Sequence, residues 1–288
     1  MRFPLSEFNR LYPDDDACLA AIMNKRYSTM KECPKCKKEK KYHRVKGRRC
    51  YECQWCGNQI YPTKGTVFEK TSVPLKSQFL VMYMMTATRS GVAAKEVERM
   101  LGISYGTAWK LCHRIRKLMA VRAKEQLSGH VEVDEAYIGG VFSGGKVGRG
   151  SPNKTAVFGI VERGGHARAF VVASTRKKAL TILINKHVAK GSTISSDRYK
   201  SYKNIREHGF THGVVKHVAK QYVNGIYHTQ TIEGFWSRLK LSINGTHVHV
   251  SKKHMQKYVD EFAFRFNERD QEQAEMFDRL LENLRMPV

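Results

Sequence analysis

Apolar residues follow a helical spacing in the first part of this 288-residue chain. The segment "PLKSQFLVMYMMTAT" keeps its apolar residues on one face, and "AAKEVERMLGISYGTAWKLCHRIRKLM" contains two helical patterns separated by the glycine of "LGIS". Two helices joined by a short turn are typical of a helix-turn-helix, which we expect over residues 73–125. Residues 1–32 show Asp residues followed by apolar residues at helical spacing, which predicts a helical lead-in.

From residue 130 onward, short strand-like runs alternate with helical patterns. We expect strands at 130–138, 155–163, 167–173, 192–196 and 213–218, and helices at 176–189, 199–208, 230–242 and 252–267. This alternation predicts an α/β domain over residues 128–288. A glycine-rich basic loop, residues 139–154, separates the first two strands.

Residues 33–70 differ from both regions, because they combine many cysteines and charges with few aliphatic residues. They contain eleven basic and three acidic residues, a net charge of +8. A segment this polar cannot fold on apolar burial alone. Two CxxC knuckles supply four thiolates, the ligands that tetrahedral Zn²⁺ prefers: Cys33, Cys36, Cys53 and Cys56. We therefore expect a zinc ribbon with a closed, structural Zn²⁺ site.

The remaining cysteines are interpreted as non-ligands. Cys50 forms a further CxxC with Cys53, but the glycine after Cys56 favours Cys53 and Cys56 as the ligand pair, which leaves Cys50 spare. Cys18 and Cys112 lie among apolar residues at helical spacing, which is typical of core packing.

The net positive charge of the chain indicates which class of molecule it binds. The chain carries 51 Lys and Arg against 26 Asp and Glu, a formal net charge of +25, and its pI is about 9.9. Such an imbalance is typical of proteins that bind nucleic acid. The longest apolar stretch, "FLVMYMMTA", is about half the length that a bilayer requires, and the N-terminus lacks the pattern of a signal peptide. We expect a cytoplasmic, nucleoid-associated protein with no membrane partner and with reduced cysteines.

Two basic segments are candidates for DNA contact. The second helix of the expected helix-turn-helix can lie in a DNA groove, and an ordinary hairpin with a solvated basic face is the alternative. In the glycine-rich loop, basic side chains can likewise reach phosphates, with a plain solvated loop as the alternative. The candidate residues are Lys110, Arg114, Arg116 and Lys117 in the helix and Lys146 and Arg149 in the loop.

Carboxylates stand at three positions where an α/β domain can bring them together. In "HVEVDEAYIGG", Glu132 and Asp134 share one face of the expected strand, and Asp134 is near its end. Asp197 ends a later strand, and Glu233 lies in the first turn of an amphipathic helix. Three hard oxygen ligands suit one or two Mg²⁺ or Mn²⁺ ions, which can assist phosphoryl transfer. Surface and capping carboxylates are the alternative.

The chain resembles the ISXO-like insertion-sequence transposases, a group of DDE transposases with an N-terminal zinc ribbon. The resemblance rests on "CPKC" with "CYECQWCGNQIYPTKGTVFEKTSVPL", on "VEVDEAYIGG", and on "HTQTIEGFWSRLK" with "HVSKKHMQKYVDEFAFRFN". These pieces extend over most of residues 30–267. The spacing also matches, because thirty-five residues separate Asp197 from Glu233 and a basic residue, Lys240, follows seven places later.

This resemblance implies a multidomain architecture in which an RNase H-like, retroviral integrase-like α/β domain follows the zinc ribbon and the helix-turn-helix. It implies that Asp134, Asp197 and Glu233 bind the catalytic Mg²⁺ or Mn²⁺, and that Lys240 contacts DNA. Asn267 is a candidate for a further polar position of the family. The expected activity is binding of terminal inverted repeats, DNA cleavage and joining of 3′ ends to target DNA, by a homodimer or higher oligomer. Glu132 and Glu135 are expected to support the site or to pair with basic side chains.

Two other functions remain open on sequence grounds. A zinc-ribbon, helix-turn-helix regulator would share the N-terminal half of the chain and catalyse nothing, although such a protein has no need of the three acids. A metal-dependent RNase H-like nuclease would cut DNA without strand transfer, and the sequence barely separates it from a transposase.

Overall fold

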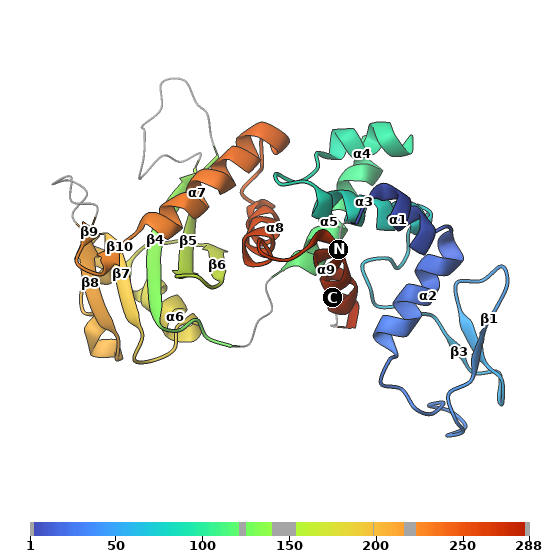
Figure 1. Ribbon diagram of the computed structural model, residues 1–288. Coiled ribbons are helices and arrows are strands. Elements are labelled where there is room, and N and C mark those ends of the chain that lie inside the picture. Colours follow the sequence, from blue (N-terminus) through green and yellow to red (C-terminus); the bar gives the residue numbers. More distant parts are fainter. Residues whose placement is uncertain (1–2, 121–124, 140–153, 198, 216–222, 286–288) are drawn as a thin grey trace. The chain divides into compact units, whose positions relative to one another are not determined.

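The computed structural model describes residues 3–120, 125–139, 154–197, 199–215 and 223–285, and the chain divides into two compact units (Figure 1). The first unit consists of residues 1–119 and 271–288, and the second of residues 120–270. Within the described residues, no helix combines the length and the apolar character needed to cross a membrane. The glycine-rich loop with Lys146 and Arg149 lies outside the described residues, apart from its two ends.

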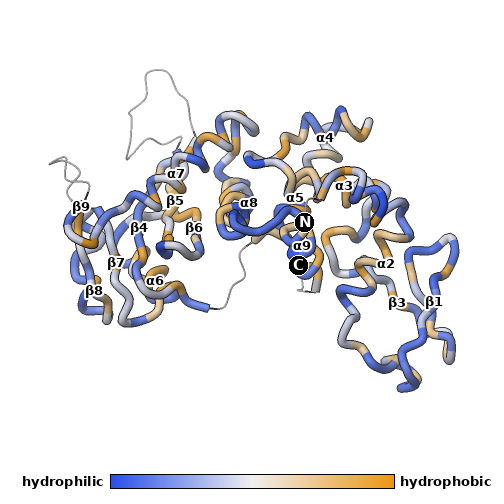
Figure 2. Tube along the Cα trace, in the orientation of Figure 1, coloured by the Kyte–Doolittle hydropathy of each residue, from blue (hydrophilic) through white to orange (hydrophobic). Residues whose placement is uncertain are grey.

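The first unit combines helices with a small zinc-ribbon sheet. Its helices are α1 (Leu5–Leu11), α2 (Asp15–Arg26), α3 (Leu75–Ala87), α4 (Ala94–Leu101), α5 (Tyr105–Met119) and α9 (Gln273–Glu282), followed by a 3₁₀ turn at Asn283–Arg285. The sheet consists of antiparallel β1 (Tyr42–Arg44), β2 (Tyr51–Cys53) and β3 (Gln59–Ile60). Figure 2 shows this ribbon segment mostly in the hydrophilic colours, as expected for a region that cannot fold on apolar burial. The two helices expected over 93–119 are present, and α4 ends at Gly102 with a left-handed φ of 63°.

An aromatic cluster packs helix α9, near the C-terminus, against the other helices of the first unit. Phe277 of α9 lies 6.1 Å from Phe8, 5.4 Å from Tyr12 and 6.0 Å from Phe79, measured between ring centroids. Leu280 and Leu281 of the same helix are also buried. We expected residues 271–288 to belong to the α/β domain. The described part, residues 271–285, instead packs with the helices of the first unit, because the apolar face of α9 is buried there.

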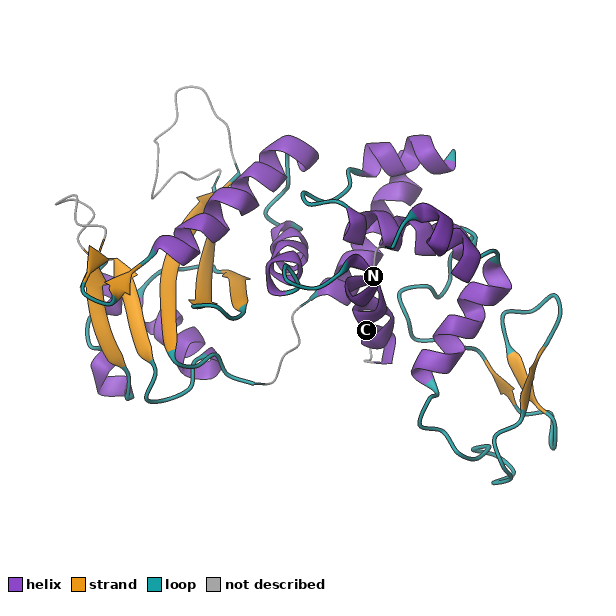
Figure 3. Ribbon diagram, viewed as in Figure 1, coloured by secondary structure: helices purple, strands orange, loops and turns teal. Residues whose placement is uncertain are grey.

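The second unit is built on a mixed five-stranded sheet with the order β6-β5-β4-β7-β8 (Figure 3). The strands are β4 (His130–Ile138), β5 (Thr155–Glu162), β6 (Ala167–Val171), β7 (Thr193–Asp197) and β8 (Thr211–Val215). Pairs β4–β5 and β5–β6 are antiparallel, and pairs β4–β7 and β7–β8 are parallel. A short hairpin, β9 (Val223–Asn224) and β10 (Tyr227–His228), precedes helix α7. The mixed sheet with its helices is compatible with the RNase H-like fold that the sequence predicts.

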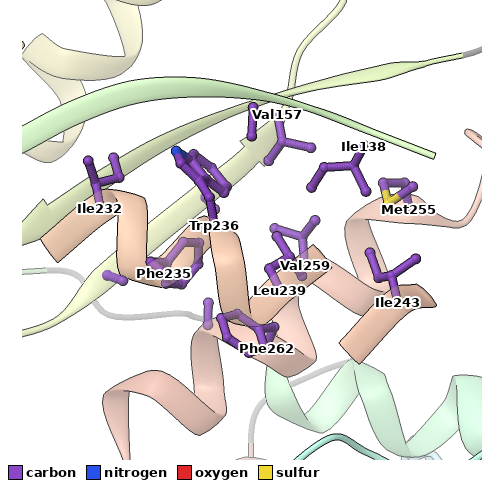
Figure 4. Packing of buried hydrophobic residues seen from close by; sticks show 14 of the residues in the cluster. Ile138, Val157, Ile232, Phe235, Trp236, Leu239, Ile243, Met255, Val259 and Phe262 are labelled. Atoms are coloured by element: carbon purple, nitrogen blue, oxygen red, sulfur yellow. The ribbon is translucent and has the colours of Figure 1, made fainter. Parts of the chain in front are cut away.

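Helices cover both faces of this sheet. Helices α7 (Gln230–Ser242) and α8 (Met255–Asn267) pack on one face, and α6 (Lys177–His187) packs on the other. Figure 4 shows the first of these cores, in which side chains of α7 and α8 meet those of β4 and β5. Side chains of β4 alternate between the two faces: Val131 and Val133 belong to the α6 side, and Ala136 and Ile138 to the α7–α8 side. Glu132 and Asp134 therefore share the face that α7 covers.

One expected helix is absent. Residues 199–208 form two short 3₁₀ turns, Lys200–Tyr202 and Ile205–His208, rather than an α-helix. Asn204 between them has a left-handed φ of 69°, which interrupts any continuous helix. The expected strand at 213–218 begins earlier, at Thr211, and is described as far as Val215.

Candidate functional site

The four predicted zinc ligands meet in the first unit. The sulfur atoms of Cys33 and Cys56 are 3.7 Å apart, those of Cys36 and Cys53 are 3.9 Å apart, and all four lie within 4.8 Å of one another. Cys50 is fully buried but is not part of this cluster, as the sequence predicts. Four thiolates at these separations fit a tetrahedral zinc ion and leave no ligand position open for substrate.

Local backbone and side-chain contacts favour the thiolate form of Cys33. Each knuckle is followed by a residue with left-handed backbone, Lys37 with φ of 59° and Gly57 with φ of 69°. Burial opposes ionisation of Cys33, but backbone N–H groups of its knuckle and the Tyr42 hydroxyl, 3.2 Å away, donate to its sulfur and lower its pKa to about 6. A thiolate is therefore favoured at neutral pH, which is the form that binds zinc.

In the second unit, two of the three predicted acids lie side by side. Strands β4 and β7 are parallel neighbours with Val133 opposite Ser196. Asp134 and Asp197 follow directly on the two strands, so they stand next to each other where β7 ends. Asp134 itself lies in the middle of β4, which continues to Ile138, so the expectation that it is near the end of its strand is wrong. The predicted convergence of these acids is a consequence of this register.

Glu233 approaches the pair from helix α7. Its Oε1 accepts a hydrogen bond of 2.7 Å from the hydroxyl of Thr229, and its side chain is exposed. Burial raises the pKa of Asp134 to about 6, and the charge of Asp197 and, to a smaller extent, of Glu233 act in the same direction. The oxygens of the three carboxylates do not all lie within 4.8 Å of one another. Among the described residues, only the four cysteines form a group of possible metal ligands that close together.

Trp236 fixes α7 against the sheet beside Asp134. Its Nε1 donates to Oδ2 of Asp134 over 3.1 Å. Figure 4 shows its indole directed from α7 toward the strands. The indole occupies the space above Gly159 of β5, the residue paired with Asp134, where an added Cβ would lie 2.5 Å from Cζ2 of Trp236. Only glycine fits at this position without displacing the indole.

The other two acids of β4 are buried and paired. Glu132 is fully buried, and its Oε1 accepts from Nε of Arg163 over 2.8 Å, so the expected ion pair is present. Glu135 is 7% exposed and accepts from the hydroxyl of Tyr202, on the opposite face of the sheet. Burial and the charge of Glu135 hold the pKa of Tyr202 well above its usual value. Sequence reasoning missed Arg163, which ends an apolar run and gave no sign of its partner.

The basic residues of α5 do not all face solvent. Lys110 and Lys117 are exposed, and Arg114 is half-buried and donates to the backbone oxygen of Glu69 over 3.1 Å. Arg116 is only 2% exposed, in the core of the first unit. The expectation that Arg116 contacts DNA is therefore wrong, because its guanidinium cannot reach a phosphate from that position.

Two further predicted positions lie in the second unit. Lys240 is exposed on α7, two turns after Glu233. Asn267, at the end of α8, accepts from the N–H of Ala167 over 2.6 Å and donates to its carbonyl oxygen over 3.1 Å. Both groups of its amide are thus occupied at the outer edge of β6, which indicates a structural role for Asn267.

Comparisons with known proteins match the regions that contain both sites. Residues 126–267 match the family model of the ISXO2-like transposase domain, and residues 13–59 match that of the transposase zinc-ribbon domain. An uncharacterized protein in transposable element ISH50 of Halobacterium salinarum is 28% identical over 252 residues, which cover 81% of this chain and 84% of the relative. The first match includes the three acids and the second includes the four cysteines. The chain thus carries an ISXO2-like transposase domain and, in its N-terminal part, a transposase zinc ribbon.

Proposed function

We propose that this protein binds the terminal inverted repeats of an insertion sequence, cleaves DNA by two-metal in-line phosphoryl transfer and joins the 3′ ends to target DNA. The observation that carries the proposal is the position of Asp134 and Asp197 next to each other on adjacent parallel strands, with Glu233 on the helix packed over them. The transposable-element origin of the relative supports the same biological role.

The donor set fits Mg²⁺ or Mn²⁺. All three groups offer hard carboxylate oxygens. Burial, together with the charges of Asp197 and Glu233, raises the pKa of Asp134, and a bound cation would offset this cost of ionisation. Such ions, when bound, stabilise the attacking and leaving oxygens of the displacement. Asp134 is held by Trp236, whereas Glu233 is exposed and can rotate about its side-chain bonds to complete the set.

DNA binding is assigned mainly to the first unit. The zinc ribbon is basic, and helices α4 and α5 have the order and turn of a helix-turn-helix, with Lys110 and Lys117 exposed on the second helix. In the second unit, Lys240 is exposed on α7, two turns after Glu233, and is a further candidate for DNA contact. The zinc ion is structural in this proposal. The protein acts on chromosomal DNA in the nucleoid, as a dimer or higher oligomer that pairs two transposon ends.

Isosteric neutralisation of the three acids tests the catalytic assignment. Asp134→Asn, Asp197→Asn and Glu233→Gln should each abolish Mn²⁺-dependent cleavage of end-containing DNA while end binding in a gel shift stays near the wild-type value. Glu207→Gln removes an exposed carboxylate elsewhere in the same unit and should leave cleavage unchanged. Full cleavage by any one variant removes that residue from the site, and full cleavage by all three shows that these acids do not carry the cleavage.

A strand-transfer assay separates the transposase from a nuclease. With pre-cut 3′ ends and a target plasmid, a transposase yields joined products, and an RNase H-like nuclease yields none. The family favours the transposase. If neither cleavage nor strand transfer is detected, the hypothesis of a zinc-ribbon regulator is favoured instead.

A further inference from the structure

Glu132 receives hydrogen bonds that normally belong to helix capping. Its Oε2 accepts from the backbone N–H of Thr231 over 2.9 Å and of Ile232 over 3.0 Å, and its Oε1 accepts from the hydroxyl of Thr231 over 3.0 Å. The residue lies in β4, about 100 positions earlier in the chain, and its side chain is fully buried. A strand carboxylate thus satisfies donors of the first turn of α7.

The first-turn N–H groups of α7 are available to Glu132 because the N-cap residue of the helix does not accept from them. First-turn N–H groups have no partner within the helix and attract negative charge. Thr229, the N-cap residue, makes no side-chain bond to these groups, and its hydroxyl donates to Glu233 instead. The charge of Glu132 is therefore placed where the helix dipole favours it.

Arg163 completes the anchor from the other side. It donates to Oε1 of Glu132, and also to the carbonyl oxygens of Ile226 over 2.7 Å and His228 over 3.0 Å. These two carbonyls belong to the hairpin that leads into α7. One ion pair therefore fixes both the approach to the helix and its first turn.

The anchor joins the two elements that carry two of the proposed metal ligands. Glu132 and Asp134 are two residues apart on the same face of β4, and Thr231 and Ile232 directly precede Glu233. From these contacts we infer that Glu132 is a positioning residue, which sets the distance between Asp134 and Glu233 by holding the first turn of α7 on β4. The inference rests on the proposed function, in which these acids bind the metal.

The variant Glu132→Gln tests this inference with little change in volume. Donors contact both oxygens of Glu132, whereas an amide has one oxygen. Glutamine must therefore leave either the α7 N–H groups or Arg163 without an acceptor. A matched control is Glu261→Gln, since Glu261 of α8 is also buried, at 4% exposure, and pairs with Arg265 over 2.8 Å, away from the first turn of α7. Both variants lose one buried ion-paired carboxylate.

Two measurements on the full-length protein decide the matter. Mn²⁺ affinity, measured by calorimetry, should fall about 10- to 100-fold in Glu132→Gln, as for other residues that orient metal ligands, and should not change in Glu261→Gln. Hydrogen exchange of the peptide that spans the first turn of α7 should be faster only in Glu132→Gln. In a Glu233→Gln background, Glu132→Gln should not weaken Mn²⁺ binding further, because the ligand that it positions is already lost.

Three results overturn the inference: unchanged Mn²⁺ affinity and exchange in Glu132→Gln, equal losses of affinity in both glutamine variants, or further loss in the Glu233→Gln background. A wild-type protein that binds no Mn²⁺ contradicts the proposed function instead. In that event the exchange measurement alone decides whether Glu132 holds α7, because it needs no metal.

Discussion

Replacing Gly159 by alanine tests how closely α7 is fitted to the strand that carries Asp134. The added Cβ would lie 2.5 Å from Cζ2 and 2.8 Å from Cη2 of Trp236, and 3.2 Å from Cδ1 of Ile232. Carbon atoms in contact are separated by about 3.5–4.0 Å, so the indole must retreat by roughly 1 Å. Trp236 is 4% exposed and packs edge-on against Phe235 at 5.1 Å, which leaves it little space to do so.

Two costs follow from this displacement. Overpacking a core costs about 1–3 kcal/mol, and a hydrogen bond to a charged group contributes about 1.5–3 kcal/mol. The two costs share one movement of the Trp236 indole and do not add fully. We therefore expect Gly159→Ala to lower the free energy of unfolding of the second unit by about 2–4 kcal/mol. DNA cleavage should fall as well, because Asp134 loses its indole partner.

A double-mutant cycle with Trp236→Leu isolates the clash. Leucine vacates the space above Gly159, so the alanine should cost less in that background, with a coupling energy of about 1–3 kcal/mol. Gly234→Ala on α7 is the control, because nothing lies within 4 Å of its added Cβ, and it should stabilise the helix by about 1 kcal/mol. Urea unfolding of the full chain, followed by hydrogen exchange of the β5 peptide, measures each variant. Wild-type stability of Gly159→Ala, or additivity within about 0.5 kcal/mol, would refute the reasoning.

Three further predictions follow from the described contacts. Cys33→Ser should lose zinc by elemental analysis and Cys50→Ser should retain it, and the reverse result would change the ligand set. Lys110→Ala combined with Lys117→Ala should reduce the slope of log affinity against log salt by about 2, and an unchanged slope would move the DNA contact off α5. Burial raises the pKa of Asp260 to about 6 from an unfolded value of 3.8, so its ionisation removes stability as the pH rises through this window. Asp260→Asn should therefore stabilise the protein by about 1–3 kcal/mol at pH 8 and have little effect at pH 4, as measured by urea unfolding, and equal effects at both pH values would contradict the assignment.

The strands of the sheet could be predicted from sequence because their periodicity, and the turn residues that end them, can be recognised within a few neighbouring residues. All five expected strands are present within a few residues of their expected bounds. The side-by-side placement of Asp134 and Asp197 could be predicted only in part, because Asp197 ends β7 as expected but Asp134 lies in the middle of β4. The contacts that hold Glu233 near them could not be predicted, because Glu132 and Thr231 are about 100 residues apart and only tertiary packing joins them.

The errors have identifiable physical causes. Arg116 lies four residues after Cys112 and eight after Ala108, on the buried stripe of α5, so its spacing indicated burial although its charge suggested solvent. The placement of α9 could not be decided from its amphipathic pattern, since such a pattern shows that a helix packs but not against which unit. The expected helix at 199–208 failed at Asn204, a residue that adopts left-handed backbone more readily than most.

The three acids of β4 have separate tasks that follow from the alternation of the strand. Glu132 points to the α7 side and holds the first turn of the helix that carries Glu233. Glu135 points to the opposite side and accepts from Tyr202, whose 3₁₀ turn lies shortly after Asp197. Each of these glutamates thus tethers a segment that bears another acid of the candidate site, and Asp134 lies between them. Because one strand contacts both segments, moving either glutamate would shift a second acid of the candidate site relative to Asp134, which gives a reason for three carboxylates on this strand in a chain of net charge +25.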